Sequence, residues 1–80
     1  MGKEYKTFIN KALERFYFRL SASGVHAERA ARESLTRAIR SLYDAAFYAD
    51  DFDALDELSE LVCAAENGDY IKPYTLGNIA

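Results

Sequence analysis

The chain has 80 residues, of which 50% are hydrophobic and 29% are charged, and its formal net charge is −3. This composition is typical of one small globular domain over residues 1–80 and excludes a disordered chain. No run approaches the roughly 18 apolar residues of a membrane span, and no charged-then-apolar leader opens the chain, so we expect a cytoplasmic protein with no membrane partner.

The first predicted helix covers about residues 4–21. Ser21, Ser23 and Gly24 supply its stop, because glycine readily takes the left-handed backbone conformation that ends a helix. The connection to the next helix is short, which predicts that the two helices form an antiparallel hairpin. The apolar residues of its inward face are Tyr5, Phe8, Ile9, Ala12, Leu13, Phe16 and Leu20.

The central predicted helix covers about residues 25–49 and contains neither proline nor glycine. Small and aliphatic residues recur along it at spacings of three and four, which predicts one buried stripe. The predicted stripe consists of Ala27, Ala31, Leu35, Ala38, Leu42, Ala45 and Ala49. Alanine lets two helix backbones approach closely, so we expect Phe8, Phe16 and Leu20 to fill the gap from the first helix.

The third predicted helix covers about residues 52–67. Asp50 or Asp51 is a suitable N-cap, and Gly68 supplies the C-terminal stop. Phe52 is expected to staple the entry of the helix. The predicted inward face consists of Leu55, Leu58, Val62 and Ala65, and the acidic residues on the opposite side are Asp53, Asp56, Glu57 and Glu60.

Residues 69–80 are predicted to form a short extended arm, since Pro73 favours an extended Lys72. The apolar residues of the arm are Tyr70, Ile71, Tyr74 and Leu76. This content is too apolar for a free tail, so we expect the arm to lie across the open end of the helices, and capture by a second chain is the alternative. The predicted fold is therefore an all-α three-helix bundle, with the third helix packed across the hairpin.

Two phenylalanines lie outside the predicted core faces. Phe18 points away from the inward face of the first helix, and Phe47 lies almost opposite the alanine stripe, near Tyr43 and Arg40. Each exposed ring forgoes burial worth about 1.5–3 kcal/mol, and aromatic and arginine side chains are enriched at the centres of interfaces. Either another element covers the two rings or they belong to a protein-binding patch.

The candidate partner-binding residues combine this aromatic–arginine surface with the acidic face of the third helix. They are Phe18, Arg40, Tyr43, Phe47, Asp53, Asp56, Glu57 and Glu60. Residues 1–40 carry nine Lys and Arg against four Asp and Glu, a charge of +5, whereas residues 41–80 carry one against nine, a charge of −8. Two interpretations are open: the two halves neutralise each other, or the fold offers one sign of charge to a partner.

The residues give little support to catalysis or metal binding. His26 is the single histidine and is expected on the surface of a turn, and Cys63 has no histidine at helical spacing to activate it. We expect Cys63 to be a half-buried structural thiol. The acidic face of the third helix lacks the loop and the glycine of a calcium site. We therefore predict no enzymatic activity, no cofactor and no metal.

The sequence favours a non-enzymatic protein-binding module that acts as an inhibitor or adapter of a larger protein complex. Helical chains of this size without a catalytic set are common among such proteins, including those that phages encode against host machinery. The first alternative is a small nucleic-acid-binding regulator that uses the basic faces of the first two helices, although Glu28 and Glu33 interrupt these faces and disfavour a nucleic-acid partner. The second alternative is a homodimer whose helices complete a larger bundle.

Overall fold

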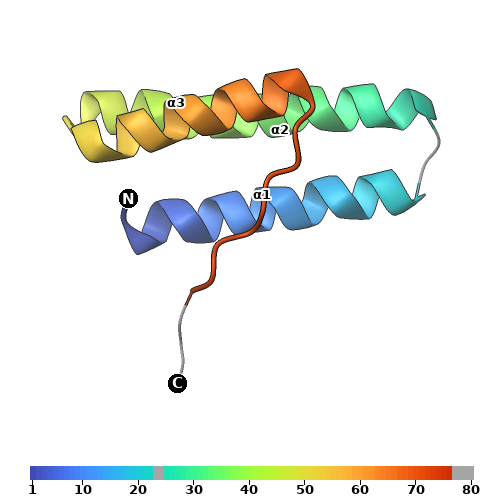
Figure 1. Ribbon diagram of the computed structural model, residues 1–80, viewed down its shortest axis with the longest axis horizontal. Coiled ribbons are helices and arrows are strands. Elements are labelled where there is room, and N and C mark those ends of the chain that lie inside the picture. The colour runs from blue at the N-terminus through green and yellow to red at the C-terminus, as the bar shows by residue number, and fades with distance from the viewer. Residues whose placement is uncertain (23–24, 77–80) are drawn as a thin grey trace.

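In the computed structural model, the described residues are 1–22 and 25–76, and the side chains of residues 25–27 lie outside the description. Within these residues the chain has no strand and forms the helices α1 (Lys3–Ala22), α2 (Val25–Tyr48) and α3 (Phe52–Asn67) (Figure 1). Each helix begins and ends within one residue of its predicted bounds. The predicted stop at Ser23 and Gly24 is outside the described residues.

The three helices form a bundle in which α2 packs against both α1 and α3. α1 and α2 run antiparallel, and α3 folds back against α2 (Figure 1). The predicted all-α fold with a long central helix is therefore confirmed. No helix among the described residues is long and apolar enough to cross a membrane.

The core lies where α2 meets its two neighbours and is closed by a residue of the C-terminal arm. Its buried side chains are Ile9, Leu13, Phe16, Ala31, Leu35, Ile39, Ala46, Ala54, Leu58, Ala65 and Ile71. Burial of one large aliphatic side chain stabilises a fold by about 1.5–3 kcal/mol. This set therefore supplies most of the stability that so small a domain has.

The buried stripe of α2 differs from the predicted one. Ile39 is 0% exposed and Ala46 is also buried, although the prediction included neither, whereas Ala45 and Ala49 are exposed. The members that keep their predicted place are Ala31 and Leu35, which are buried, and Ala38 and Leu42, which are half-buried. α2 packs against α1 on one side and α3 on another. Because its buried face must cover both helices, this face is centred closer to Ile39 than to the predicted alanines. The side chain of Ala27 lies outside the described residues.

The two ends of α3 are capped as predicted, but its entry is not stapled. The Asp51 carboxylate accepts a hydrogen bond from the Ala54 N–H at 3.2 Å, and Gly68 closes the helix in the left-handed conformation with φ 81°. Phe52 is 68% exposed, so the predicted staple is wrong. The tight turn before α3, in which Asp50 adopts φ 57°, leaves this ring outside the helix pair. On the inward face Leu58 and Ala65 are buried as predicted, Leu55 and Val62 are half-buried, and Ala54 is buried in addition.

Residues 69–76 of the arm are ordered against the helices, but they cross the side of α1 and not the predicted open end of the bundle (Figure 1). Residues 77–80 are outside the described residues. Ile71 is buried, and its carbonyl accepts a hydrogen bond from the Tyr17 hydroxyl at 3.2 Å. Asn10 holds Tyr74 at both backbone groups: its Nδ2 donates to the Tyr74 carbonyl at 2.9 Å, and its Oδ1 accepts from the Tyr74 N–H at 2.8 Å. These contacts fix the arm across α1.

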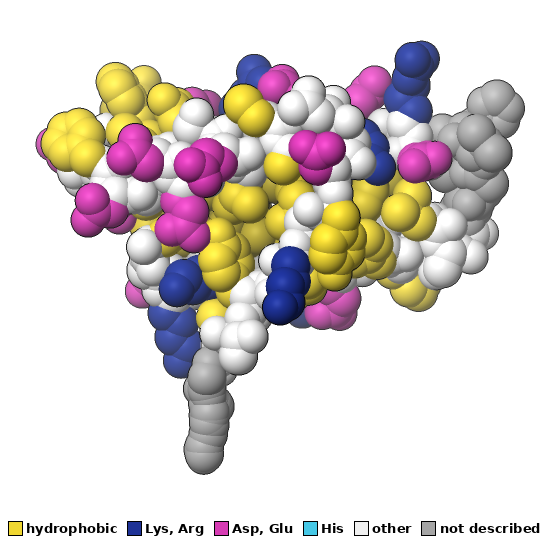
Figure 2. Space-filling model, viewed as in Figure 1, with side chains coloured by type: hydrophobic (Ala, Val, Ile, Leu, Met, Phe, Trp, Pro, Cys, Tyr) yellow, Lys and Arg dark blue, Asp and Glu magenta, His cyan; other side chains and the backbone are white. Residues whose placement is uncertain are grey.

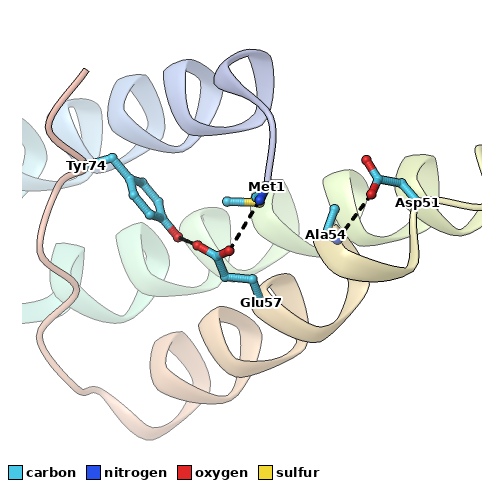
Figure 3. A network of polar contacts seen from close by, with 5 residues as sticks. All are labelled: Met1, Asp51, Ala54, Glu57 and Tyr74. Carbon is cyan, nitrogen blue, oxygen red and sulfur yellow. Dashed lines mark hydrogen bonds and ion pairs between the residues drawn. The ribbon is translucent and has the colours of Figure 1, made fainter. Parts of the chain in front are cut away.

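Glu57 ties the arm and the first residue of the chain to α3. The Tyr74 hydroxyl donates a hydrogen bond to Glu57 Oε2 at 2.6 Å, and the Met1 amino group lies 3.7 Å from Glu57 Oε1 (Figure 3). Burial of the Tyr74 ring, with the bond to Glu57 and its negative charge, raises the pKa of the Tyr74 hydroxyl well above its ordinary value.

The raised pKa of Tyr74 predicts a loss of stability at high pH. The unfolded chain releases the Tyr74 proton near pH 10 while the folded chain retains it, so the free energy of unfolding falls as the pH rises above about 10. Tyr74→Phe should lower the stability at pH 8 but make the further decrease at pH 10.5 smaller than in the wild type. Urea unfolding of both proteins at the two pH values measures this difference. An equal decrease in both would contradict it.

Candidate protein-binding surfaces

Three aromatic side chains are exposed together where α2 passes into α3. Phe47 and Tyr48 end α2 and are 57% and 85% exposed, and Phe52 opens α3. The Phe47 and Tyr48 rings meet edge-on with their centroids 5.5 Å apart. We call these three residues the aromatic tip. The turn that carries them extends beyond the start of α1, so no other helix shields it (Figure 1).

Acidic side chains surround the aromatic tip. Figure 2 shows hydrophobic and acidic side chains gathered at this end of the molecule. The exposed acidic residues next to the tip in the sequence are Asp44, Asp50, Asp53 and Asp56. In the part of the chain that the structure describes, none of these four carboxylates lies in an ion pair. The tip therefore combines apolar rings with unpaired negative charge.

The predicted aromatic–arginine patch holds only in part. Of the two alternatives left open by the sequence, exposure holds for both rings: Phe18 is 71% exposed and Phe47 is also exposed. Antiparallel α1 and α2, however, place the two rings toward opposite ends of the bundle. Tyr43 is half-buried against the core, and the Arg40 guanidinium pairs with the Glu66 carboxylate at 2.5 Å. The structure therefore does not join these four predicted residues into one surface.

The predicted acidic face of α3 loses one member. Asp53, Asp56 and Glu60 are exposed, whereas Glu57 is half-buried beneath the arm and bound to Tyr74. The expected position of Glu57 on the open acidic face is therefore wrong, because the arm covers that side of α3. Cys63 is exposed, so the predicted half-buried thiol is also wrong. The His26 side chain lies outside the described residues.

An apolar groove of about 370 Å³ runs between α1 and α2. Its floor is apolar and is formed mainly by Ala12, Phe16, Ala31, Leu35 and Ala38. Phe8 was predicted to lie inward, but it is 44% exposed and forms one wall of the groove. We call this feature the α1–α2 groove.

Basic side chains form the rim of the α1–α2 groove. Lys11, Arg15 and Arg19 follow one another at four-residue spacing along α1 and are all exposed. Among residues 1–22 and 25–76 no carboxylate pairs with any of the three. The four-residue spacing of these basic residues can be read from the sequence. The groove cannot, because it forms only where α2 packs against α1 and leaves Ala38 half-buried between them.

The arginines of α2 line a different hollow and are partly neutralised. Arg29, Arg32, Arg37 and Arg40 lie there together with Glu33 and Glu66. Arg32 is 3.6 Å from the Glu28 carboxylate and also lies over the Phe16 ring, and Arg40 pairs with Glu66. Two of the four arginines are thus engaged within the chain, which weakens the case for a phosphate-binding stripe.

A family model matches residues 1–80 of the chain. The chain belongs to this family, whose description is a domain of unknown function (DUF4754). No curated protein and no solved structure matches the chain.

The two surfaces of this DUF4754 chain have opposite chemistry. The aromatic tip offers exposed rings among carboxylates, and the α1–α2 groove offers an apolar floor between cations. Sequence reasoning found Phe47, placed Phe52 as a staple at the entry of the third helix and did not single out Tyr48. The aromatic tip could have been predicted from its local composition, because three aromatic residues flank a turn that contains two aspartates.

Proposed function

We propose that this DUF4754 chain is a non-enzymatic protein-binding module of the inhibitor or adapter kind and that it binds a protein through the aromatic tip. The observation that carries the proposal is the joint exposure of Phe47, Tyr48 and Phe52 at one turn. We further propose that it acts in the cytoplasm, where a reducing environment keeps a free and exposed thiol such as Cys63 intact.

The exposure of the three tip rings costs free energy that binding to a partner would recover. An exposed ring forgoes about 1.5–3 kcal/mol of burial, and three adjacent rings forgo it at one place. A partner that covers them recovers this energy, and aromatic side chains grouped in this way are typical of the few residues that dominate protein–protein affinity. Phe47 and Tyr48 already contact each other, so part of the ordering cost is met before binding.

The charges around the tip favour a partner with a basic, partly apolar surface. Asp44 and Asp53 repel acidic surfaces and attract Lys and Arg, which accelerates encounter and selects among partners. Arginine in particular would meet both features, because its guanidinium pairs with carboxylates and packs over aromatic rings.

Photocrosslinking in the cell that makes the protein tests the proposal. A photoreactive benzoylphenylalanine in place of Tyr48 should give discrete adducts with another polypeptide chain under light. The same group in place of Tyr70, an aromatic residue on the arm that is 73% exposed, should not. Phe47→Ser combined with Phe52→Ser should remove the Tyr48 adducts without changing the helical content. Absence of adducts at Tyr48, or equal adducts at both positions, would contradict the proposed function.

A further inference from the structure

We infer that the α1–α2 groove is the docking site for the aromatic tip of a second copy of this chain. The inference rests on the proposed function, since the tip is the same binding surface, and it names one partner for it. The contact joins two different surfaces, so residues of the tip on one copy meet residues of the groove on the next.

The α1–α2 groove matches the aromatic tip in shape and polarity. The groove has an apolar floor in which Ala12 and Ala38 leave space between the helices, and Phe8 supplies an aromatic wall. Its volume of about 370 Å³ lies within the range of about 300–1,000 Å³ that is usual for ligand pockets. Rings inserted from a protruding turn fit such a site, because they bring a large apolar area at a small cost in side-chain entropy.

The α1–α2 groove and the aromatic tip also have complementary charge. Lys11, Arg15 and Arg19 rim the groove, and aspartates surround the tip, with no ion pair to any of these residues in the described chain. Docking would bring the basic residues of the groove rim close to the aspartates of the tip, so that they form ion pairs. Arg15 and Arg19 would also come within reach of the tip rings, where cation–π attraction adds to the pairing.

The fold does not remove the charge asymmetry of the sequence by internal pairing. Within the described residues, two ion pairs join the basic half of the chain to the acidic half. They are Met1 with Glu57 and Arg40 with Glu66, and neither involves the tip or the groove rim. The two surfaces therefore keep opposite charge in solution, which favours contact between copies at low ionic strength.

Two variants separate the two halves of the contact. The tip variant carries Phe47→Ser and Phe52→Ser, and the groove variant carries Arg15→Glu and Arg19→Glu. All four side chains are exposed, so both variants should retain the wild-type helical content. Arg29→Glu with Arg37→Glu is the matched control for the groove variant, because it makes the same charge change on the other hollow of the bundle.

Mass-average molar mass, measured by light scattering or sedimentation equilibrium at low salt, tests the inference. The wild type and the Arg29/Arg37 control should exceed the mass of one chain and rise with concentration, and added salt should lower that mass. The tip variant and the groove variant should each stay at the mass of one chain. An equimolar mixture of the two variants should associate, because the groove variant has an intact tip and the tip variant has an intact groove.

Four results would overturn the inference: a wild type at the mass of one chain at all concentrations, a variant that still associates alone, a mixture that stays at the mass of one chain, or a control that fails to associate. The proposed function is judged separately. Adducts between the Tyr48 position and another protein would support it even if the mixture failed to associate, and loss of those adducts would contradict it whatever the mixture does.

Discussion

Replacing Ile39 with alanine is expected to lower the free energy of unfolding by about 2–5 kcal/mol. Ile39 is fully buried in the stripe of α2, so the truncation leaves a cavity that the surrounding helices close only in part. A domain of this size has about 4–12 kcal/mol of stability in total, so the loss is a large fraction of it. Urea unfolding followed by circular dichroism measures the change in the midpoint.

Leu42→Ala is the matched control for this prediction. Leu42 belongs to the stripe that the sequence predicted, but it is half-buried, so its truncation should cost clearly less than that of Ile39. If Leu42→Ala were the more damaging of the two, the buried face of α2 would be centred on the alanines after all.

Replacing Ile71 with alanine is expected to lower the free energy of unfolding by about 2–4 kcal/mol, although Ile71 belongs to no helix. Its side chain is the one apolar group of the described arm that is buried in the core, and its carbonyl accepts the Tyr17 hydrogen bond. The variant should also weaken the two hydrogen bonds between Asn10 and the Tyr74 backbone. The buried Ile71 side chain and these hydrogen bonds hold the same short segment of the arm. Urea unfolding measures the first effect, and amide hydrogen exchange at Tyr74 measures the second.

Lys72→Ala provides the comparison for the arm. Lys72 is exposed beside Ile71, so its replacement should change the stability by no more than about 0.5 kcal/mol. Similar small effects of both substitutions, with unchanged exchange at Tyr74, would show that the arm does not contribute to the core.

The helix boundaries could be predicted from the sequence because each depends on local chemistry. Asp51 caps α3 and Gly68 closes it, and both act through backbone conformation and hydrogen bonds within a few residues. α2 contains no glycine or proline that would break it. Signals of this kind need no knowledge of the neighbouring helices.

The direction of individual side chains could not be predicted with the same success. The stripe of α2 turned toward Ile39 because two neighbours share its surface, and no single periodicity describes a face with two contacts. Helical geometry alone predicts that Glu57 faces solvent, but Tyr74 of the arm lies over it and donates a hydrogen bond to its carboxylate. Helical geometry predicts an inward Phe8, but the ring is exposed as one wall of the α1–α2 groove. Phe52 is predicted to staple the entry of α3, but the turn before the helix leaves it exposed.

The candidate surfaces illustrate the same division. The outward positions of Phe18 and Phe47 follow from helical geometry, and the structure agrees with both. The aromatic tip and the α1–α2 groove each combine residues from two helices, so they become visible only when the helices are placed together.

Comparison of ¹H–¹⁵N spectra of the wild-type protein at low and high concentration tests the tip–groove contact most directly. The amide signals of residues 47–53 and of residues 8–19 should shift together as the concentration rises, while those of residues 70–74 should stay in place. Shifts in one of the two regions alone, shifts in the arm, or an unchanged spectrum would contradict it.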